Sequence, residues 1–220
     1  MEPFLLTDCA LISIATGEMA LNLRELRDRL GRMTDPAVTY FHFWGGLLRP
    51  HFVDPEYQND FAAWAYHSLH ERRLAERLAI INPSDFEAID NLRLKVIDVI
   101  EERMDEQDFE PHVEAENPFF FMRFQIVIFD TRQRIQTPEE LAQIIPTISL
   151  GSLFYHFIDS RRRTESRSND FSEWMAGLGE QYAGLAAQIA AIDPYFKTLT
   201  ELRDHLRMIL QSNLQKTENS

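Results

Sequence analysis

The sequence predicts a mainly α-helical fold with a small β element, an α+β fold in which two pseudo-symmetric repeats pack as one compact unit. The first observation behind this prediction is an internal duplication. Residues 59–64 (Asn-Asp-Phe-Ala-Ala-Trp) return as residues 169–174 (Asn-Asp-Phe-Ser-Glu-Trp), and residues 40–43 (Tyr-Phe-His-Phe) return as residues 154–157 (Phe-Tyr-His-Phe). The second observation is that each copy opens with a strand-like stretch and continues with helix caps and helix-ending prolines.

The duplication also sets the predicted domain boundaries. Repeat 1 covers residues 1–105 and repeat 2 covers residues 118–214. An acidic connection at 106–117 joins them, and the polar tail 215–220 is expected to fray. Each repeat is expected to contain one strand and about five helices.

The β element is expected at the start of each repeat. Residues 3–6 correspond to residues 118–121, and residues 11–14 correspond to residues 126–129. Their β-branched and aromatic content favours strand over helix. We expect the two strands to pair, or to lie near each other, at the pseudo-twofold axis.

Helix starts are marked by capping residues at equivalent places. Asn22 is followed three residues later by Glu25, and Thr137 is followed in the same way by Glu140. This spacing is typical of a capping box, in which each side chain accepts a hydrogen bond from a free backbone N–H. The Asn-Asp-Phe motif is expected to start a further helix in each repeat.

The last helix of each repeat is expected after a proline stop. A helix ends before Pro83 in repeat 1 and before Pro194 in repeat 2, because the residue before proline avoids the helical conformation. Residues 84–87 (Ser-Asp-Phe-Glu) predict another capping box at the start of the last helix of repeat 1. The apolar stripes expected to face the core are Ile89, Leu92, Val96 and Ile100 in repeat 1, and Leu199, Leu202, Leu206 and Ile209 in repeat 2.

Composition favours a soluble globular protein over a membrane, secreted or disulfide-rich one. Apolar residues make up 45% and charged residues 26% of the chain, so a soluble globular protein with a buried core is expected. No apolar run approaches the roughly 20 residues that span a bilayer, and the N-terminus lacks the basic region of a signal peptide. The single Cys9 excludes an internal disulfide framework. These features predict a cytoplasmic protein without a membrane partner.

The net charge of −13 is concentrated in the first half of the chain. Residues 1–117 carry 23 acidic and 11 basic side chains, whereas residues 118–220 carry 12 and 11. An acidic surface repels phosphate backbones, which argues against a nucleic-acid partner. The basic run at 161–163, with Arg167, could bind an anion or an acidic partner, although a solvated helix end is the more ordinary interpretation.

Two histidines and two aspartates form the main candidate site. His42 corresponds to His156, and Asp60 corresponds to Asp170. If the repeats pack about a twofold axis, these four residues could converge on a Zn²⁺, Mn²⁺ or Fe²⁺ ion with an open position for water. The simpler interpretation is that each buried imidazole hydrogen-bonds the aspartate of its own repeat and so locks two helices together. We favour the structural interpretation and keep metal ligation as the alternative.

Aromatic residues beside these histidines suggest a second kind of site. Trp44, Trp64 and Trp174 could line a ligand pocket together with His42 and His156. At helical spacing, such residues more often form a core.

Motifs for other chemistry are missing from the sequence. There is no nucleophile elbow, no phosphate-binding loop and no dinucleotide-binding glycine pattern. The sequence therefore names no cofactor and leaves open whether the protein is an enzyme.

Taken together, the motifs resemble those of an uncharacterised prokaryotic domain family. The resemblance rests on residues 15–17 (Ala-Thr-Gly) and 20–26, followed by Phe-His-Phe, Asn-Asp-Phe-x-x-Trp and Tyr-His-Phe. It covers nearly the whole chain and implies a self-contained soluble protein without a known active site. It also implies an association with gene neighbourhoods of sugar-handling enzymes, and hence an accessory role in carbohydrate metabolism.

Three functions follow from these features, in order of preference. The first is a non-enzymatic binding or adaptor protein, as a monomer or a homodimer, with an acidic face for a protein partner. The second is a small-molecule binding protein with a pocket between the repeats. The third is a metal-dependent enzyme that uses His42, His156, Asp60 and Asp170.

Overall fold

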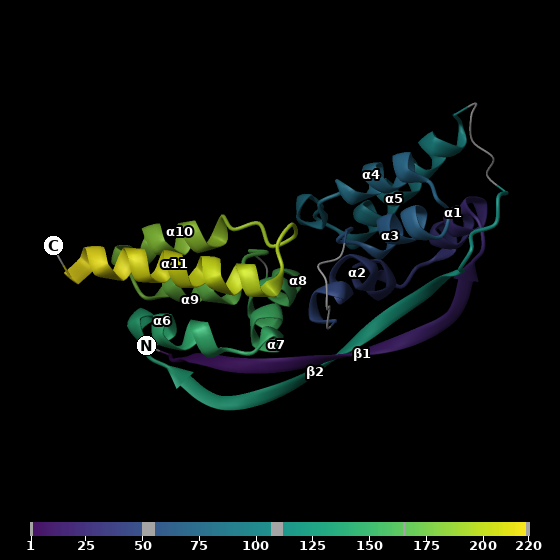
Figure 1. Cartoon of the computed structure of the whole chain (residues 1–220). Coiled ribbons are helices and arrows are strands. Elements are labelled where there is room, and N and C mark those ends of the chain that lie inside the picture. The colour runs from purple at the N-terminus through teal and green to yellow at the C-terminus, as the bar shows by residue number, and fades with distance from the viewer. Residues whose placement is uncertain (1, 50–55, 107–111, 165, 219–220) are drawn as a thin grey trace. The chain divides into compact units, whose positions relative to one another are not determined.

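The computed structural model describes residues 2–49, 56–106, 112–164 and 166–218. Within these ranges the chain is mainly helical, and its two strands form a single sheet (Figure 1). The predicted α+β class is therefore confirmed. No helix in the described ranges is both long and apolar enough to cross a bilayer.

The chain divides into two compact units, where the sequence analysis expected one. Unit 1 combines Met1–Ala10 with Ile126–Ser220, and unit 2 is Leu11–Gln125. Both cuts fall inside the strands β1 (Phe4–Ala20) and β2 (Phe119–Ile135). The compact units differ from the sequence repeats because the first half of each strand packs on the helices of the other repeat.

The two strands pair along the ribbon in Figure 1, as predicted. The Thr16 hydroxyl donates to the carbonyl of Phe121, and the Thr131 hydroxyl donates to the carbonyl of Leu6. The residue numbers of both pairs have the same sum, which is the register of an antiparallel ladder.

Unit 2 contains the first five α-helices. Its elements are α1 (Leu23–Arg32), α2 (Pro36–Trp44), η1 (Gly45–Leu48), α3 (Asp60–His67), α4 (Arg72–Ala79), η2 (Pro83–Asp85) and α5 (Ile89–Met104), where η1 and η2 are 3₁₀ turns. The predicted capping box at α1 is present. The Asn22 side chain accepts from the Glu25 N–H, and the Glu25 carboxylate accepts from the Leu21 N–H.

The predicted capping box at residues 84–87 is wrong. The Asn82 side chain accepts the N–H of Ser84 and closes the short turn η2 instead. Helix α5 begins only at Ile89, after Ala88, which has no capping side chain. Asn82 forms this cap because it precedes Pro83 in an extended conformation, from which its side-chain oxygen reaches the N–H two residues later.

Unit 1 contains the remaining helices. Its elements are α6 (Pro138–Ile144), η3 (Ile145–Thr147), α7 (Leu150–Leu153), η4 (Phe154–Asp159), α8 (Ser160–Arg163), α9 (Asp170–Gly177), η5 (Glu180–Tyr182), α10 (Ala183–Ala190) and α11 (Leu199–Glu218). The segment η4 is a π-helical turn, so α7, η4 and α8 follow one another without a break. The predicted capping box at α6 is present, with the Thr137 hydroxyl accepting from Glu140 and the Glu140 carboxylate accepting from Gln136.

Helix α11 shows two differences from prediction. The fourth buried member of its stripe is Leu210, whereas Ile209 is only half-buried, because the 3.6-residue period turns Leu210 toward the core after Leu206. The helix also continues to Glu218, so the segment 215–220 that is expected to fray begins inside it.

The acidic connection is only partly described, because residues 107–111 lie outside the described ranges. Its second part belongs to unit 2 and is held there by backbone hydrogen bonds. The Ala115 N–H donates to the Leu21 carbonyl, and the Glu116 N–H donates to the Ser68 carbonyl. Residues 112–117 therefore run beside Leu21 and Ser68 up to the start of β2.

Candidate functional site

His42 lies on α2 and is 3% exposed. Its Nδ1 lies 2.8 Å from Oδ2 of Asp60, the first residue of α3. Its Nε2 lies 3.1 Å from the backbone N of Met122 on β2 and can only accept that hydrogen bond. The partners therefore assign a neutral imidazole with its proton on Nδ1. This one side chain joins two helices and a strand.

Arg49 completes the set in unit 2. Its two terminal nitrogens donate to the two carboxylate oxygens of Asp60, each at 3.2 Å. Its guanidinium lies 4.9 Å from the ring centroid of Phe41. The planar guanidinium thus satisfies both oxygens of the carboxylate that orients His42.

His156 in unit 1 has the same kinds of partner. Its Nδ1 lies 2.7 Å from Oδ2 of Asp170, and its Nε2 accepts the backbone N–H of Thr7 at 2.9 Å. Arg163 donates to the same carboxylate at 3.0 Å and lies 4.0 Å above the ring of Tyr155. Each unit therefore contains one His–Asp–Arg set whose imidazole accepts a backbone N–H from a strand.

Aromatic rings pack against the histidine of each His–Asp–Arg set. Phe119 of β2 lies 4.7 Å from His42 and 5.7 Å from Trp64 between ring centroids. Phe4 of β1 lies 4.8 Å from His156 and 5.5 Å from Trp174. In each unit, one strand phenylalanine is therefore enclosed between the histidine and a tryptophan.

The three tryptophans have packing partners inside their own units. Trp64 donates from Nε1 to the carbonyl of Asn117 at 2.8 Å, and Trp174 donates to the carbonyl of Glu2 at 3.4 Å. Trp44 is 5% exposed, with its ring 6.4 Å from that of Tyr40. These contacts are typical of a core around the strands.

Burial sets the electrostatics of the unit 2 set. Burial lowers the pKa of His42, and the hydrogen bond to Asp60 offsets this only in part. Burial alone would raise the pKa of Asp60, but His42 and Arg49 together lower it below its ordinary value. The stable arrangement is a neutral imidazole beside a carboxylate that is paired with arginine.

The geometry bears directly on the metal hypothesis. The structure pairs His42 with Asp60 in unit 2 and His156 with Asp170 in unit 1. Both nitrogens of each ring already take part in hydrogen bonds, so ligation would require breaking one of them. Across the described ranges, no group of three or more His, Cys, Asp or Glu side chains could hold a metal ion.

The sequence analysis missed the two arginines. Arg49 follows His42 by seven residues, and Arg163 follows His156 by the same number. This shared spacing was the available signal. Arg163 also belongs to the basic run at 161–163, which is not simply solvated: Arg162 and Arg163 both pair with Asp159, which is 1% exposed.

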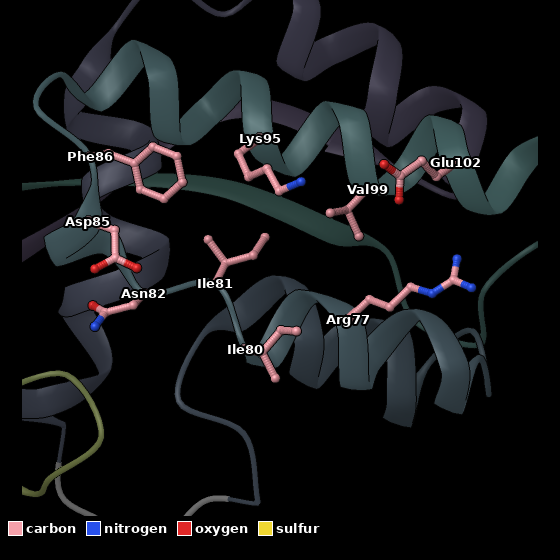
Figure 2. A pocket seen from close by; sticks show the side chains of 9 residues that line it. All are labelled: Arg77, Ile80, Ile81, Asn82, Asp85, Phe86, Lys95, Val99 and Glu102. Atoms are coloured by element: carbon pink, nitrogen blue, oxygen red, sulfur yellow. The ribbon is translucent and has the colours of Figure 1, made fainter.

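A groove outside these sets lies in unit 2, between α4, η2 and α5 (Figure 2). Its volume is about 370 Å³. Its apolar lining is Ile80, Ile81, Phe86 and Val99, and its polar lining is Arg77, Asn82, Asp85, Lys95 and Glu102. Sequence reasoning did not find this groove, because its residues come from a helix end, a turn and a helix face.

The charged side chains of the groove lining are balanced, because two are cations and two are carboxylates. The cation Arg77 pairs with Glu106, a residue outside the lining, at 2.6 Å. Glu106 also accepts from Arg73 and Arg103, and the hydrogen bonds from Arg73 and Arg77 lower its pKa to about 2. The lining therefore carries no net charge and lies next to the acidic end of α5.

Comparisons with known proteins agree with the fold. A family described as a family of unknown function (DUF5752) matches residues 1–211. The chain is also similar to a solved structure described as that of OrfY from Thermoproteus tenax. The sequences are 25% identical, the match covers 96% of this chain and 95% of that one, and the TM-score is 0.80. No curated protein matches the chain.

Proposed function

The chain belongs to the family of unknown function DUF5752. From the geometry of the structure, we propose that it is a non-enzymatic binding protein. The groove between α4 and α5 is the binding surface. The observation that carries the proposal is an apolar lining next to an acidic helix end, the combination that an adaptor with an acidic face requires. Ile80 is 76% exposed at this groove, and an exposed isoleucine there is explained by a partner that covers it.

The His–Asp–Arg sets are structural in this proposal. Each uses both imidazole nitrogens, two helices and a strand N–H, and each is enclosed by aromatic rings. A general base or a metal ligand needs a free nitrogen facing a cavity. These sets instead hold the strand to the helices, so the chemistry of the protein is recognition and not catalysis.

The two units are, we propose, pseudo-symmetric copies. An offset of 115 residues relates the strand contacts, with Phe4 matching Phe119 and Thr7 matching Met122. The histidines, the aspartates and the arginines that follow each histidine by seven residues have the same partners in both units. The duplication supports a shared scaffold, and the residues that line the groove all belong to unit 2.

The partner of the groove is a protein segment with an apolar anchor and basic flanks. Residues 11–125 carry 21 acidic and 12 basic side chains, which favours a positively charged partner. A volume of about 370 Å³ accommodates one or two large apolar side chains. Arg77 is paired with Glu106, which weakens its repulsion of such a segment.

Synthetic peptides test the proposal. Two labelled helical peptides share a leucine stripe and differ in lysine or glutamate flanks, and their binding is measured by fluorescence polarisation. We expect the lysine peptide to bind, more weakly at high salt. Ile80→Ser should weaken this binding, whereas Leu94→Ser should not, because Leu94 is exposed on α5 outside the groove. Equal binding of both peptides, or equal effects of both substitutions, contradicts the proposal.

A further inference from the structure

The β ribbon leaves one edge of β1 open in unit 2. On β2, the Met122 N–H donates to His42, so this side of β2 faces α2 and β1 pairs on the other side, as Figure 1 shows. Beyond strand pairing, no backbone–backbone hydrogen bond of the described residues involves residues 11–17. We call this stretch the β1 open edge.

The β1 open edge lacks the charges that usually protect an edge strand. Exposed edges are normally blocked by charged side chains, because unpaired N–H and C=O groups are a template for another strand. From Leu11 to Gly17 there is no charged residue before Glu18, and Ile12 is 51% exposed. This uncharged, apolar and exposed strand has the composition of a pairing surface.

The second half of β2, in unit 1, is an edge strand that does carry charged side chains. It carries three exposed charged residues, Asp130, Arg132 and Arg134, and Asp130 pairs with Arg134 at 2.9 Å. Arg132 has a φ of 62°, and Gly17 at the equivalent place on β1 has a φ of 85°, so this interruption is common to both strands and the difference between them is one of charge. The positions 115 residues earlier on β1 are uncharged, namely Ala15, Gly17 and Met19. The two outer strands therefore differ in charge at equivalent places.

We propose that the β1 open edge pairs antiparallel with the same edge of a second copy of this chain, forming a four-stranded sheet in a twofold dimer. Twofold symmetry brings identical edges together, and antiparallel pairing of identical strands satisfies their free N–H and C=O groups mutually. A chain of net charge −13 repels its own copy over most of its surface. The uncharged edge lets two copies meet without opposing like charges.

Sedimentation equilibrium of the full chain tests this proposal, with Ile12→Lys and Ile128→Lys as matched variants. Ile128 lies on β2 and is 54% exposed, close to the value for Ile12. We expect a dimer for the wild type and for I128K. In I12K we expect the dimer dissociation constant to rise by about tenfold, because symmetry introduces the charge twice. A monomeric wild type, or equal weakening by both variants, overturns the proposal.

Amide hydrogen exchange locates the interface independently of any substitution. Exchange of wild-type residues 11–17 should slow as the protein concentration rises, whereas exchange of residues 126–132 should not change. Protection that rises with concentration only elsewhere in the chain would place the dimer contact on another surface and overturn the proposal.

Discussion

Replacing His42 by phenylalanine should destabilise unit 2, because it removes both hydrogen bonds of a buried imidazole. The Met122 N–H then loses its acceptor, which costs about 1–3 kcal/mol. Asp60 loses one donor but keeps Arg49, which costs about 1 kcal/mol more. Burial of the larger apolar ring of phenylalanine stabilises the folded state by about 1 kcal/mol. The net loss is about 2 kcal/mol.

His42→Gln is the matched control, because glutamine keeps one donor and one acceptor. We expect it to lose only about 1 kcal/mol, since its amide can still bond both Asp60 and the strand. Urea unfolding of the full chain, followed by tryptophan fluorescence, measures both variants. Trp44 and Trp64 lie in unit 2 and report on it, while Trp174 reports on unit 1.

Hydrogen exchange at Met122 gives the residue-level test of the same reasoning. Its amide should exchange faster in H42F than in H42Q or the wild type, because only phenylalanine offers no acceptor. If H42F were as stable as the wild type and its Met122 amide equally protected, the role assigned to the imidazole would be refuted.

Three further predictions concern pH, a thiol and a close contact. Burial lowers the pKa of His42 in the folded protein below its ordinary 6.5, so on acidification the unfolded chain takes up a proton before the folded one does. The free energy of unfolding should therefore be greatest above pH 6.5 and should decrease as the pH falls from 6.5 toward the lowered pKa. Urea midpoints between about pH 8 and pH 5 check this, and H42Q should flatten the curve. Burial, followed by the charge of Asp8, raises the pKa of Cys9 to about 12, so a thiol reagent at neutral pH should label it only on unfolding. Rapid labelling of the native protein would contradict this. Gly151→Ala should lower the melting temperature, because its Cβ would clash with the carbonyl oxygen of Cys9, at a cost of about 1–3 kcal/mol. Gly31→Ala meets no atom within 4 Å and should be neutral or stabilising.

Much of the fold was predictable because its signals are local. The caps at Asn22 and Thr137 and the presence of the two strands follow from neighbouring residues and from β-branched or aromatic content. The division into units was not predictable in this way. Phe4 and Phe119 lie in similar apolar contexts, so the sequence does not tell which set of helices each strand joins.

The candidate site was predicted in part for the same reason. The pairing of each histidine with the aspartate of its own repeat was visible as a duplicated pattern. The strand N–H that each imidazole accepts was not, because a backbone donor leaves no trace in side-chain identity. The π-helical turn η4 was also hidden, since Tyr155 and Phe157 occur in the same pattern as their counterparts on the α-helical α2.

The division of the strands determines the order in which the protein can assemble during synthesis. Unit 2 is a continuous segment, Leu11–Gln125, and can fold as soon as its last residues leave the ribosome. Unit 1 needs Met1–Ala10, which are made before unit 2, together with Ile126–Ser220, which are made after it. The N-terminal half of β1 must therefore wait, without its helices, until the segment that follows unit 2 has been synthesised. Termination directly after Gln125 would leave unit 2 intact and this apolar segment without its partners.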